Sequence, residues 1–123
     1  LVGPVDNKTL AQELSKSAVL AYPCVPVRYT EGFSIAVLDA CAAGCLPFIS
    51  DVDALPSIYK GYAQILEGNP RVKRNRWVKS MTYYLTHERE RRKEAQRCVE
   101  FAKRFSRQEV SKTWERLVAG GEL

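Results

Sequence analysis

The sequence contains neither a long apolar run nor a recognisable metal-binding pattern. No apolar stretch approaches the roughly 20 residues that a membrane-spanning helix needs, so we expect no transmembrane segment. The four cysteines are Cys24, Cys41, Cys45 and Cys98. They include no C-x-x-C pair, and His87 is the only histidine, which argues against a zinc site. Nothing indicates a secreted disulfide framework, so we interpret the cysteines as buried small hydrophobes in a reducing compartment.

The first residues, LVGPVDNK, lack the basic and apolar blocks of a signal peptide and also lack an initiator Met. We therefore expect a cytoplasmic chain that begins inside a longer protein. Its 123 residues suffice for one domain, or a piece of one, with a buried core. Apolar residues make up 46% and charged residues 27%, which is ordinary for globular proteins.

The net charge of +5 is unevenly distributed along the chain. Residues 1–66 carry four basic and six acidic groups, whereas residues 67–123 carry fifteen basic and eight acidic groups. We therefore divide the single domain into an α/β core at about 1–69 and C-terminal helices at about 70–123.

Short strands alternate with helices in the first half. Asp6 is a candidate N-cap for a helix that carries Leu10 and Leu14 on one face. Apolar runs at 18–22, 46–50 and 63–66 predict three strands. Pro47 suggests that the second run begins a strand or lies at an edge. This alternation predicts an α/β fold with a Rossmann-like parallel sheet flanked by helices and followed by a helical tail.

From Arg71 onward the apolar spacing is helical. Val78, Met81 and Leu85 form one stripe, and a second follows at Ala95, Cys98, Ala102 and Phe105. Ser106 with Glu109 has the pattern of a capping box. A last stripe consists of Val110, Trp114, Leu117 and Val118.

The central stretch, TEGFSIAVLDACAAG at 30–44, predicts a helix that is apolar on every side and therefore buried all round. Gly44 is its expected C-terminal cap. Asp39 is the exception, because a buried carboxylate is costly unless something binds it. The loop before this helix follows the carboxyl end of a strand, where ligands of parallel sheets bind.

This stretch has the chemistry of a nucleotide-sugar site. Gly32 permits close approach of a ligand, and Ser34 is a candidate N-cap whose neighbouring amides would receive a phosphate. Asp39, about 7–8 Å further along the axis, suits two vicinal hydroxyls, and Glu31 suits a second polyol. The alternative is that Glu31 is a loop acid and that Asp39 is satisfied by a neighbouring amide or by Arg28.

The segment EGFSIAVLDACAAGCLPFISDVDALPSIY resembles the signature of glycosyltransferase family four. These retaining enzymes, glycogen-synthase-like and sucrose-synthase-like, have the GT-B fold and an E-x7-E motif. Glu31 and Asp39 have the motif's seven intervening residues. Further positions also match, namely Ala40, Ala42, Ala43, Gly44, Pro47, Ser50 and Asp51. The flanks VGPVDNKTLAQELSKSAVLAYP and RFSRQEVSKTWERL look like the preceding helix and strand and the closing helix.

The resemblance implies a role for each residue of the motif. Glu31 would position the donor sugar, and the amides around Gly32 and Phe33 would face that sugar. The amides of Ser34 and Ile35 would face the distal phosphate, and Asp39 would bind the ribose hydroxyls. The family needs no metal or other cofactor. Three positions depart from the family pattern. Asp39 replaces the usual Glu, and Ser34 stands where glycine is common. Ser57 stands where a Glu often follows the LP pair, so we assign it no role.

The resemblance also implies that this chain is the partial, C-terminal, donor-binding domain of a glycosyltransferase. A nucleotide-diphosphate sugar would be its donor, and the missing N-terminal domain would hold an acceptor sugar or lipid-linked glycan. An Arg and a Lys that usually contact the phosphates are absent too, so we expect no catalysis from this piece alone. The alternative function is a non-catalytic domain of the same fold that binds a nucleotide or a partner.

Two further patterns each have a structural and a functional interpretation. Asp51-Val-Asp53 imitates a D-x-D metal motif, but its place after a strand favours an ordinary loop. Basic runs at 71–76 and 89–93 are interspersed with acids further on, which favours a solvated helix face. The alternative is peripheral contact with an anionic membrane. We expect no nucleic-acid binding, because no base-stacking aromatic cluster accompanies the charge.

Overall fold

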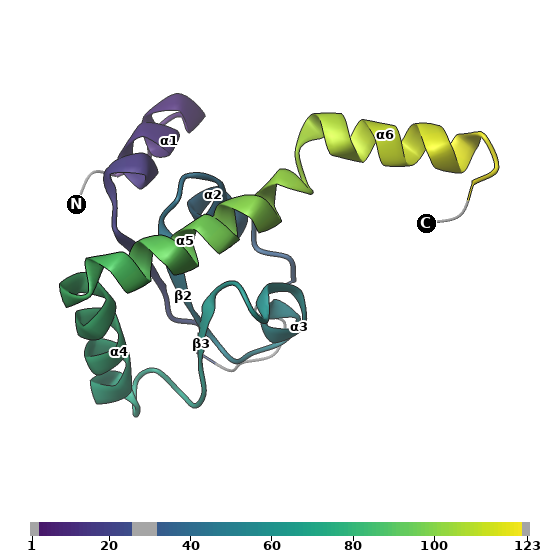
Figure 1. The fold of residues 1–123 in the computed structure, drawn as a ribbon. Helices are drawn as coiled ribbons and strands as arrows, with labels where there is room; N and C mark the ends of the chain where they lie inside the picture. Colours follow the sequence, from purple (N-terminus) through teal and green to yellow (C-terminus); the bar gives the residue numbers. More distant parts are fainter. Residues whose placement is uncertain (1–2, 26–31, 122–123) are drawn as a thin grey trace.

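The computed structural model describes residues 3–25 and 32–121 and has an α/β fold (Figure 1). The elements in chain order are α1 (Asn7–Lys16), β1 (Val19–Tyr22), α2 (Ile35–Ala42), β2 (Leu46–Ser50), α3 (Leu55–Tyr59), β3 (Gln64–Leu66), α4 (Arg74–Thr86), α5 (Glu88–Lys103) and α6 (Arg107–Val118). The three strands form a parallel sheet in the order β1-β2-β3. The predicted fold class is therefore confirmed.

The central strand β2 is buried along its whole length and pairs with β1 and β3. The expectation that Pro47 marks a strand start or an edge is wrong, because it lies at the second position of this central strand. The pairing explains why proline is tolerated. Leu46 N donates to Ala18 O on the β1 side, so the next residue faces β3. Pairing with β3 begins only at Phe48, so the missing N–H costs no ladder hydrogen bond.

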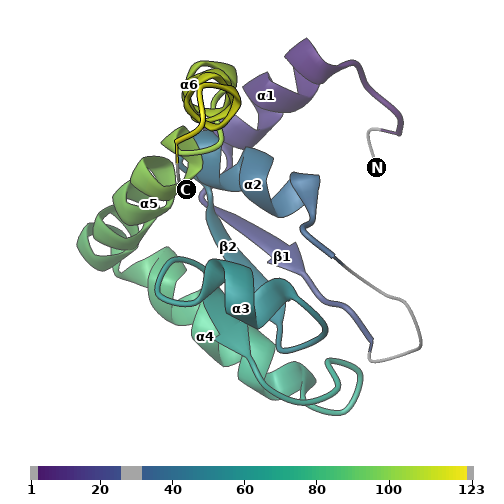
Figure 2. The ribbon, with the colours of Figure 1, turned by 90° about the vertical axis from the view of Figure 1, so that its right-hand side faces the viewer.

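The helices that connect the strands end at glycines. Gly44 after α2 has φ +74°, and Gly61 after α3 has φ +85°, a region that glycine enters without steric cost. In Figure 2 α1 and α2 lie above the strands and α4 lies below them. The core brings together the strands, α2, α3, α4 and α5, with Phe48, Ile49 and Tyr59 among its fully buried side chains.

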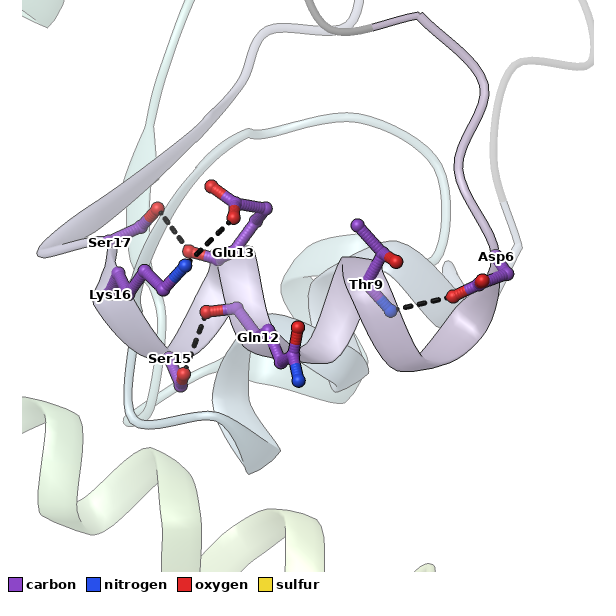
Figure 3. A network of polar contacts seen from close by, with 7 residues as sticks. All are labelled: Asp6, Thr9, Gln12, Glu13, Ser15, Lys16 and Ser17. Atoms are coloured by element: carbon purple, nitrogen blue, oxygen red, sulfur yellow. Dashed lines mark hydrogen bonds and ion pairs between the residues drawn. The ribbon is translucent and has the colours of Figure 1, made fainter.

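Helix α1 has no buried residue. Local hydrogen bonds at its two ends stabilise it instead (Figure 3). Asp6 Oδ1 accepts from Thr9 N at 2.7 Å, which confirms the predicted N-cap. That hydrogen bond holds the pKa of the Asp6 carboxyl below its usual value. At the other end Lys16 pairs with Glu13 at 3.0 Å. The helix is thus defined at both ends although it adds no side chain to the buried core.

The C-terminal tail consists of three helices, and its apolar pattern is only partly buried. In α4 the buried residue is Trp77, whereas Val78 and Leu85 of the expected stripe are 55% and 49% exposed. Helix α5 buries Ala95, Cys98, Phe101 and Ala102, so its stripe is confirmed except at Phe105, which lies beyond the helix and is exposed.

Helix α6 begins where the sequence predicts and then leaves the body of the molecule (Figure 1). Ser106 Oγ accepts from Glu109 N at 3.3 Å. No residue of α6 is buried, so the expected stripe contacts no core, and Trp114 is 63% exposed. Among the described residues no helix is both long and apolar enough to cross a membrane.

Candidate functional site

The candidate site lies at the start of α2, after the carboxyl end of β1. This is the edge of a parallel sheet where ligands bind. Gly32, Phe33, Ser34 and Ile35 are described there, and Asp39 follows on α2. Glu31, expected to position the sugar, lies outside the described residues, and so does Arg28, the alternative partner of Asp39.

Helix α2 has one closed face and one open face, so the expectation that it is buried all round is wrong. Val37, Ala40 and Cys41 are fully buried. Ile35, by contrast, is 64% exposed. Asp39 is half-buried rather than buried. The apolar pattern gave the wrong expectation because α1 covers the second face only loosely, and three alanines among eight residues do not indicate which side is covered.

The open face of α2 borders a cavity of about 480 Å³ between α1 and α2. Ile35, Asp39 and Ala42 form one wall at helical spacing, together with Ala43. The opposite wall, from α1, consists of Asn7, Leu10, Ala11, Leu14 and Ser15. Asp39 is the only ionisable side chain among these residues, so the cavity combines apolar walls with one carboxylate.

The carboxylate of Asp39 has no partner in the described part of the chain. No described residue donates a hydrogen bond to it or forms an ion pair with it. A half-buried carboxylate beside open space is a suitable acceptor for ligand hydroxyls. The solvent that reaches the cavity explains how the chain tolerates this group without an internal partner.

Ser34 occupies the N-cap position of α2 in an unusual conformation. Its φ is +53° and its ψ is 93°, and its side chain makes no capping hydrogen bond. The predicted N-cap position of Ser34 is therefore confirmed, but its side chain does not cap the helix, because a capping serine has extended backbone dihedrals. Its Oγ is buried and has no hydrogen-bond partner among the residues that the structure describes. An L-residue with positive φ is strained, which accounts for the glycine that the resemblance implies here.

Tyr59 of α3 holds the backbone at the start of α2. Its hydroxyl donates to Phe33 O at 2.8 Å and lies 3.0 Å from Ser34 O. The Phe33 ring packs against Phe105 with 5.0 Å between centroids. The side chain of Phe33 is therefore engaged in packing, and only its backbone is available to a ligand. Because Tyr59 is fully buried, this contact fixes the helix start against the core.

A cluster of thiols lies between the closed face of α2 and α5. Of the four cysteines that the sequence predicts to be buried, Cys41, Cys45 and Cys98 are fully buried, whereas Cys24 is only partly buried. Burial raises the pKa of Cys45 to about 11, and contact with the Cys98 thiol together with burial raises the pKa of Cys41. Cys98 Sγ donates to Tyr62 O at 3.3 Å. Contact with the Cys41 thiol lowers the pKa of Cys98 from its ordinary value. Cys41 and Cys45 stay protonated at neutral pH and are weak nucleophiles, and the buried cluster is part of the packing between α2 and α5.

The structure adds little support for a ligand role of Gly32 or for a metal site at the acids after β2. A Cβ added at Gly32 would meet nothing within 4 Å, so the fold itself does not require glycine there. Asp51 is exposed, and Asp53 has φ +49°. Among the described residues no group of three or more His, Cys, Asp or Glu is placed to hold a metal ion.

The α1 wall of the cavity was not predicted from the sequence. Leu10 and Leu14 were assigned to an apolar face, but the spacing did not indicate that this face borders open space beside Asp39. Asn7, at the first position of α1, adds a polar group at that wall. The sequence signal for this polar group was its position directly after the N-cap Asp6, at the start of α1. No protein-family model matches the chain, and no curated protein matches it closely enough to indicate a relationship.

Proposed function

We propose that this chain is the nucleotide-sugar-binding part of a retaining glycosyltransferase. The observation that carries the proposal is the Asp39 carboxylate, without a partner among the described residues, on the wall of a 480 Å³ cavity. A nucleoside has an apolar face and a pair of ribose hydroxyls, which are the two features that this cavity complements. The E-x7-E spacing from Glu31 to Asp39 supports the same assignment.

The phosphates would bind at the start of α2. Its first backbone N–H groups have no partner within the helix and carry a partial positive charge. Ser34 Oγ is buried there without a partner, and a phosphate oxygen would satisfy it. From Ser34 to Asp39 the helix rises about 7–8 Å, so one ligand spans from phosphate to ribose along α2. Helix polarity thus orients the nucleotide with its phosphates toward the loop that contains Glu31.

Glu31 would then accept hydrogen bonds from the donor sugar and position its reacting carbon. Transfer with retention requires the new bond from the acceptor oxygen to the anomeric carbon to form on the same face of the sugar as the bond that breaks to release the diphosphate. The diphosphate leaves with negative charge, which the N-terminus of α2 stabilises. No metal or other cofactor has a role in this proposal, and the acceptor would be bound by a separate domain.

The second candidate is a non-catalytic domain of the same fold that binds a nucleotide or a partner. One observation favours it: the described residues that line the cavity include no Lys or Arg. A departing diphosphate is usually neutralised by such cations. The two candidates differ in whether sugar is bound and transferred, whereas both require the cavity to hold a nucleotide.

An NMR titration of this chain with UDP, GDP and ADP, and then with their sugar conjugates, tests the proposal. We expect one nucleotide to shift the amides of residues 34–39 saturably, with a millimolar dissociation constant because cations are lacking. Both Asp39→Ala and Glu31→Ala should weaken binding of the sugar conjugate, but only Asp39→Ala should weaken binding of the free nucleotide. No saturable shift with any nucleotide would overturn the proposal.

Asp51→Ala serves as the matched control, since Asp51 is an exposed acid that follows the neighbouring strand and lies outside the cavity lining. It removes the same charge as Asp39→Ala and should leave every titration unchanged. Nucleotide binding without any contribution from the sugar, and without an effect of Glu31→Ala, would favour the non-catalytic candidate. Adding Mn²⁺ to the same samples tests the Asp51-Val-Asp53 interpretation, and we expect no change in affinity.

A further inference from the structure

The positive charge of the molecule is concentrated around α4. The segment 68–87 contains five cations, Arg71, Lys73, Arg74, Arg76 and Lys79, and no Asp or Glu. The rest of the chain carries fourteen Lys and Arg against fourteen Asp and Glu, so this segment accounts for the whole net charge of +5. Neither the cavity beside α2 nor the proposed function explains this concentration.

The cations of segment 68–87 differ from those of the following helices in their pairing. Among the described residues only Arg76 forms an ion pair, to the exposed Glu67 at 3.8 Å. In α5 and α6 the glutamates lie one turn before their cations, as in the pairs of Arg92 with Glu88, Arg97 with Glu94, Lys103 with Glu100 and Lys112 with Glu109. Both basic runs are largely solvent-exposed, as the sequence predicts, but only the second is partly compensated by ion pairs within its own helix.

Segment 68–87 also exposes apolar side chains beside its cations. Val72 is 77% exposed, Val78 55% and Leu85 49%. Arg74, Val78 and Leu85 are four and seven residues apart, so at 3.6 residues per turn they share one flank of α4. This is the composition of a helix that lies at a lipid headgroup boundary, with cations on phosphates and aliphatic groups below them.

The core contacts of α4 centre on Trp77 and Tyr84, about a quarter turn around the helix from the exposed flank, which adds little to the buried core. Trp77 is 6% exposed, and the Tyr84 ring packs against Phe48 of β2 with 5.7 Å between centroids. In Figure 2 α4 lies below the strands, whereas the cavity is between α1 and α2 above them. A surface bound to α4 would therefore leave the cavity beside Asp39 accessible.

We propose that segment 68–87, with Arg74, Val78 and Leu85 at its centre, docks on an anionic phospholipid membrane. Charge complementarity selects this partner, because five cations, of which only Arg76 pairs with an acid, attract a surface of phosphodiester and carboxylate groups. Exposed aliphatic side chains favour lipid over nucleic acid, which would instead use stacking aromatics or a groove-reading helix. The proposal does not depend on the nucleotide site.

Flotation with phosphatidylcholine vesicles, with and without phosphatidylserine, tests this proposal on the whole chain. We expect binding only to vesicles that contain phosphatidylserine, and weaker binding as salt increases. Each cation near such a surface contributes about fivefold to partitioning, so the pair Arg74→Gln and Lys79→Gln should weaken binding roughly 25-fold. Leu85→Ser should weaken it by a smaller factor at every salt concentration.

The matched control is the pair Arg97→Gln and Lys103→Gln, which removes the same charge from cations of α5 that are paired with Glu94 and Glu100. It should change vesicle binding less than threefold, and circular dichroism should confirm that all variants are folded. Equal binding to neutral vesicles, no binding to either kind, or equal losses in both pairs would each overturn the proposal. Tighter binding to RNA or duplex DNA than to vesicles, lost with Arg74→Gln and Lys79→Gln, would overturn it in favour of a nucleic acid.

Discussion

The two faces of α2 have nearly the same composition but opposite environments. On one face Val37, Ala40 and Cys41 pack against the core and have no exposed area. On the other face Ile35 and Asp39 border the cavity, and Ile35 remains 64% exposed. An apolar helix therefore does not imply a helix buried all round. The faces differ because α5 and the strands pack closely on one side, whereas α1 contributes no buried residue on the other.

This difference assigns separate tasks to the two faces. The closed face positions the helix, and the Tyr59 hydroxyl fixes its start by contacting Phe33 O and Ser34 O. The open face is then free to present a carboxylate to a ligand, because stability does not depend on filling the space beside it. Rigid support on one side and a polar group at a cavity on the other is the arrangement that a binding site requires.

Matched asparagine substitutions on the two faces should produce the largest difference. Val37→Asn loses apolar burial and leaves an amide without partners in the core, so we expect the unfolding free energy to fall by about 3–5 kcal/mol. Ile35→Asn lies at the exposed helix start and should change it by about 0.5 kcal/mol or less. Urea denaturation followed by circular dichroism measures both. Similar losses in the two variants would show that the open face is covered in solution.

Removal of the Tyr59 hydroxyl should have the next largest effect. Tyr59→Phe leaves the carbonyls of Phe33 and Ser34 without this donor, so the unfolding free energy should fall by about 1–3 kcal/mol. The amide resonances of residues 33–36 should move more than those of α5. The control is Tyr83→Phe, since Tyr83 is 47% exposed and should tolerate the loss of its hydroxyl. An unchanged stability for Tyr59→Phe would mean that this contact does not fix the helix start.

The smallest of the three stability effects should be a stabilisation, from the substitution Ser34→Gly. Ser34→Gly relieves the strain of φ +53° and removes a buried hydroxyl without a partner. Against these gains, glycine has more freedom to lose on folding, so we expect a net stabilisation of about 0.5–1 kcal/mol. Ser34→Ala keeps the strained backbone and is the control. If the hydroxyl binds a phosphate, the more stable glycine variant should bind nucleotide less tightly, and equal or tighter binding would contradict that role.

Local signals made much of the fold predictable. The N-cap at Asp6, the glycine at Gly44 and the apolar run of β2 each act within a few residues, and each prediction is confirmed within about one residue. Pro47 and the α4 stripe were misassigned because their outcome depends on pairing and packing partners that are distant in the sequence.

The candidate site was predictable only in part. The spacing of Asp39 from the start of α2 could be read from the sequence, as could the position of Ser34 at the helix start. The α1 wall with Asn7 could not be predicted, because the sequence does not indicate that α1 packs beside the open face of α2. The positive φ of Ser34 was equally hidden, since serine at an N-cap ordinarily adopts an extended backbone.

The central claim is that Asp39 binds the ribose hydroxyls of a nucleotide. The most direct measurement compares a nucleoside diphosphate with its 2′,3′-dideoxy analogue in NMR titrations of the native chain and of Asp39→Asn. A hydrogen bond to a charged group contributes about 1.5–3 kcal/mol, so the native chain should bind the dideoxy analogue at least tenfold more weakly. Asp39→Asn should bind the two ligands almost equally. The same preference for the ribose hydroxyls in both proteins, or none in the native chain, would contradict the account.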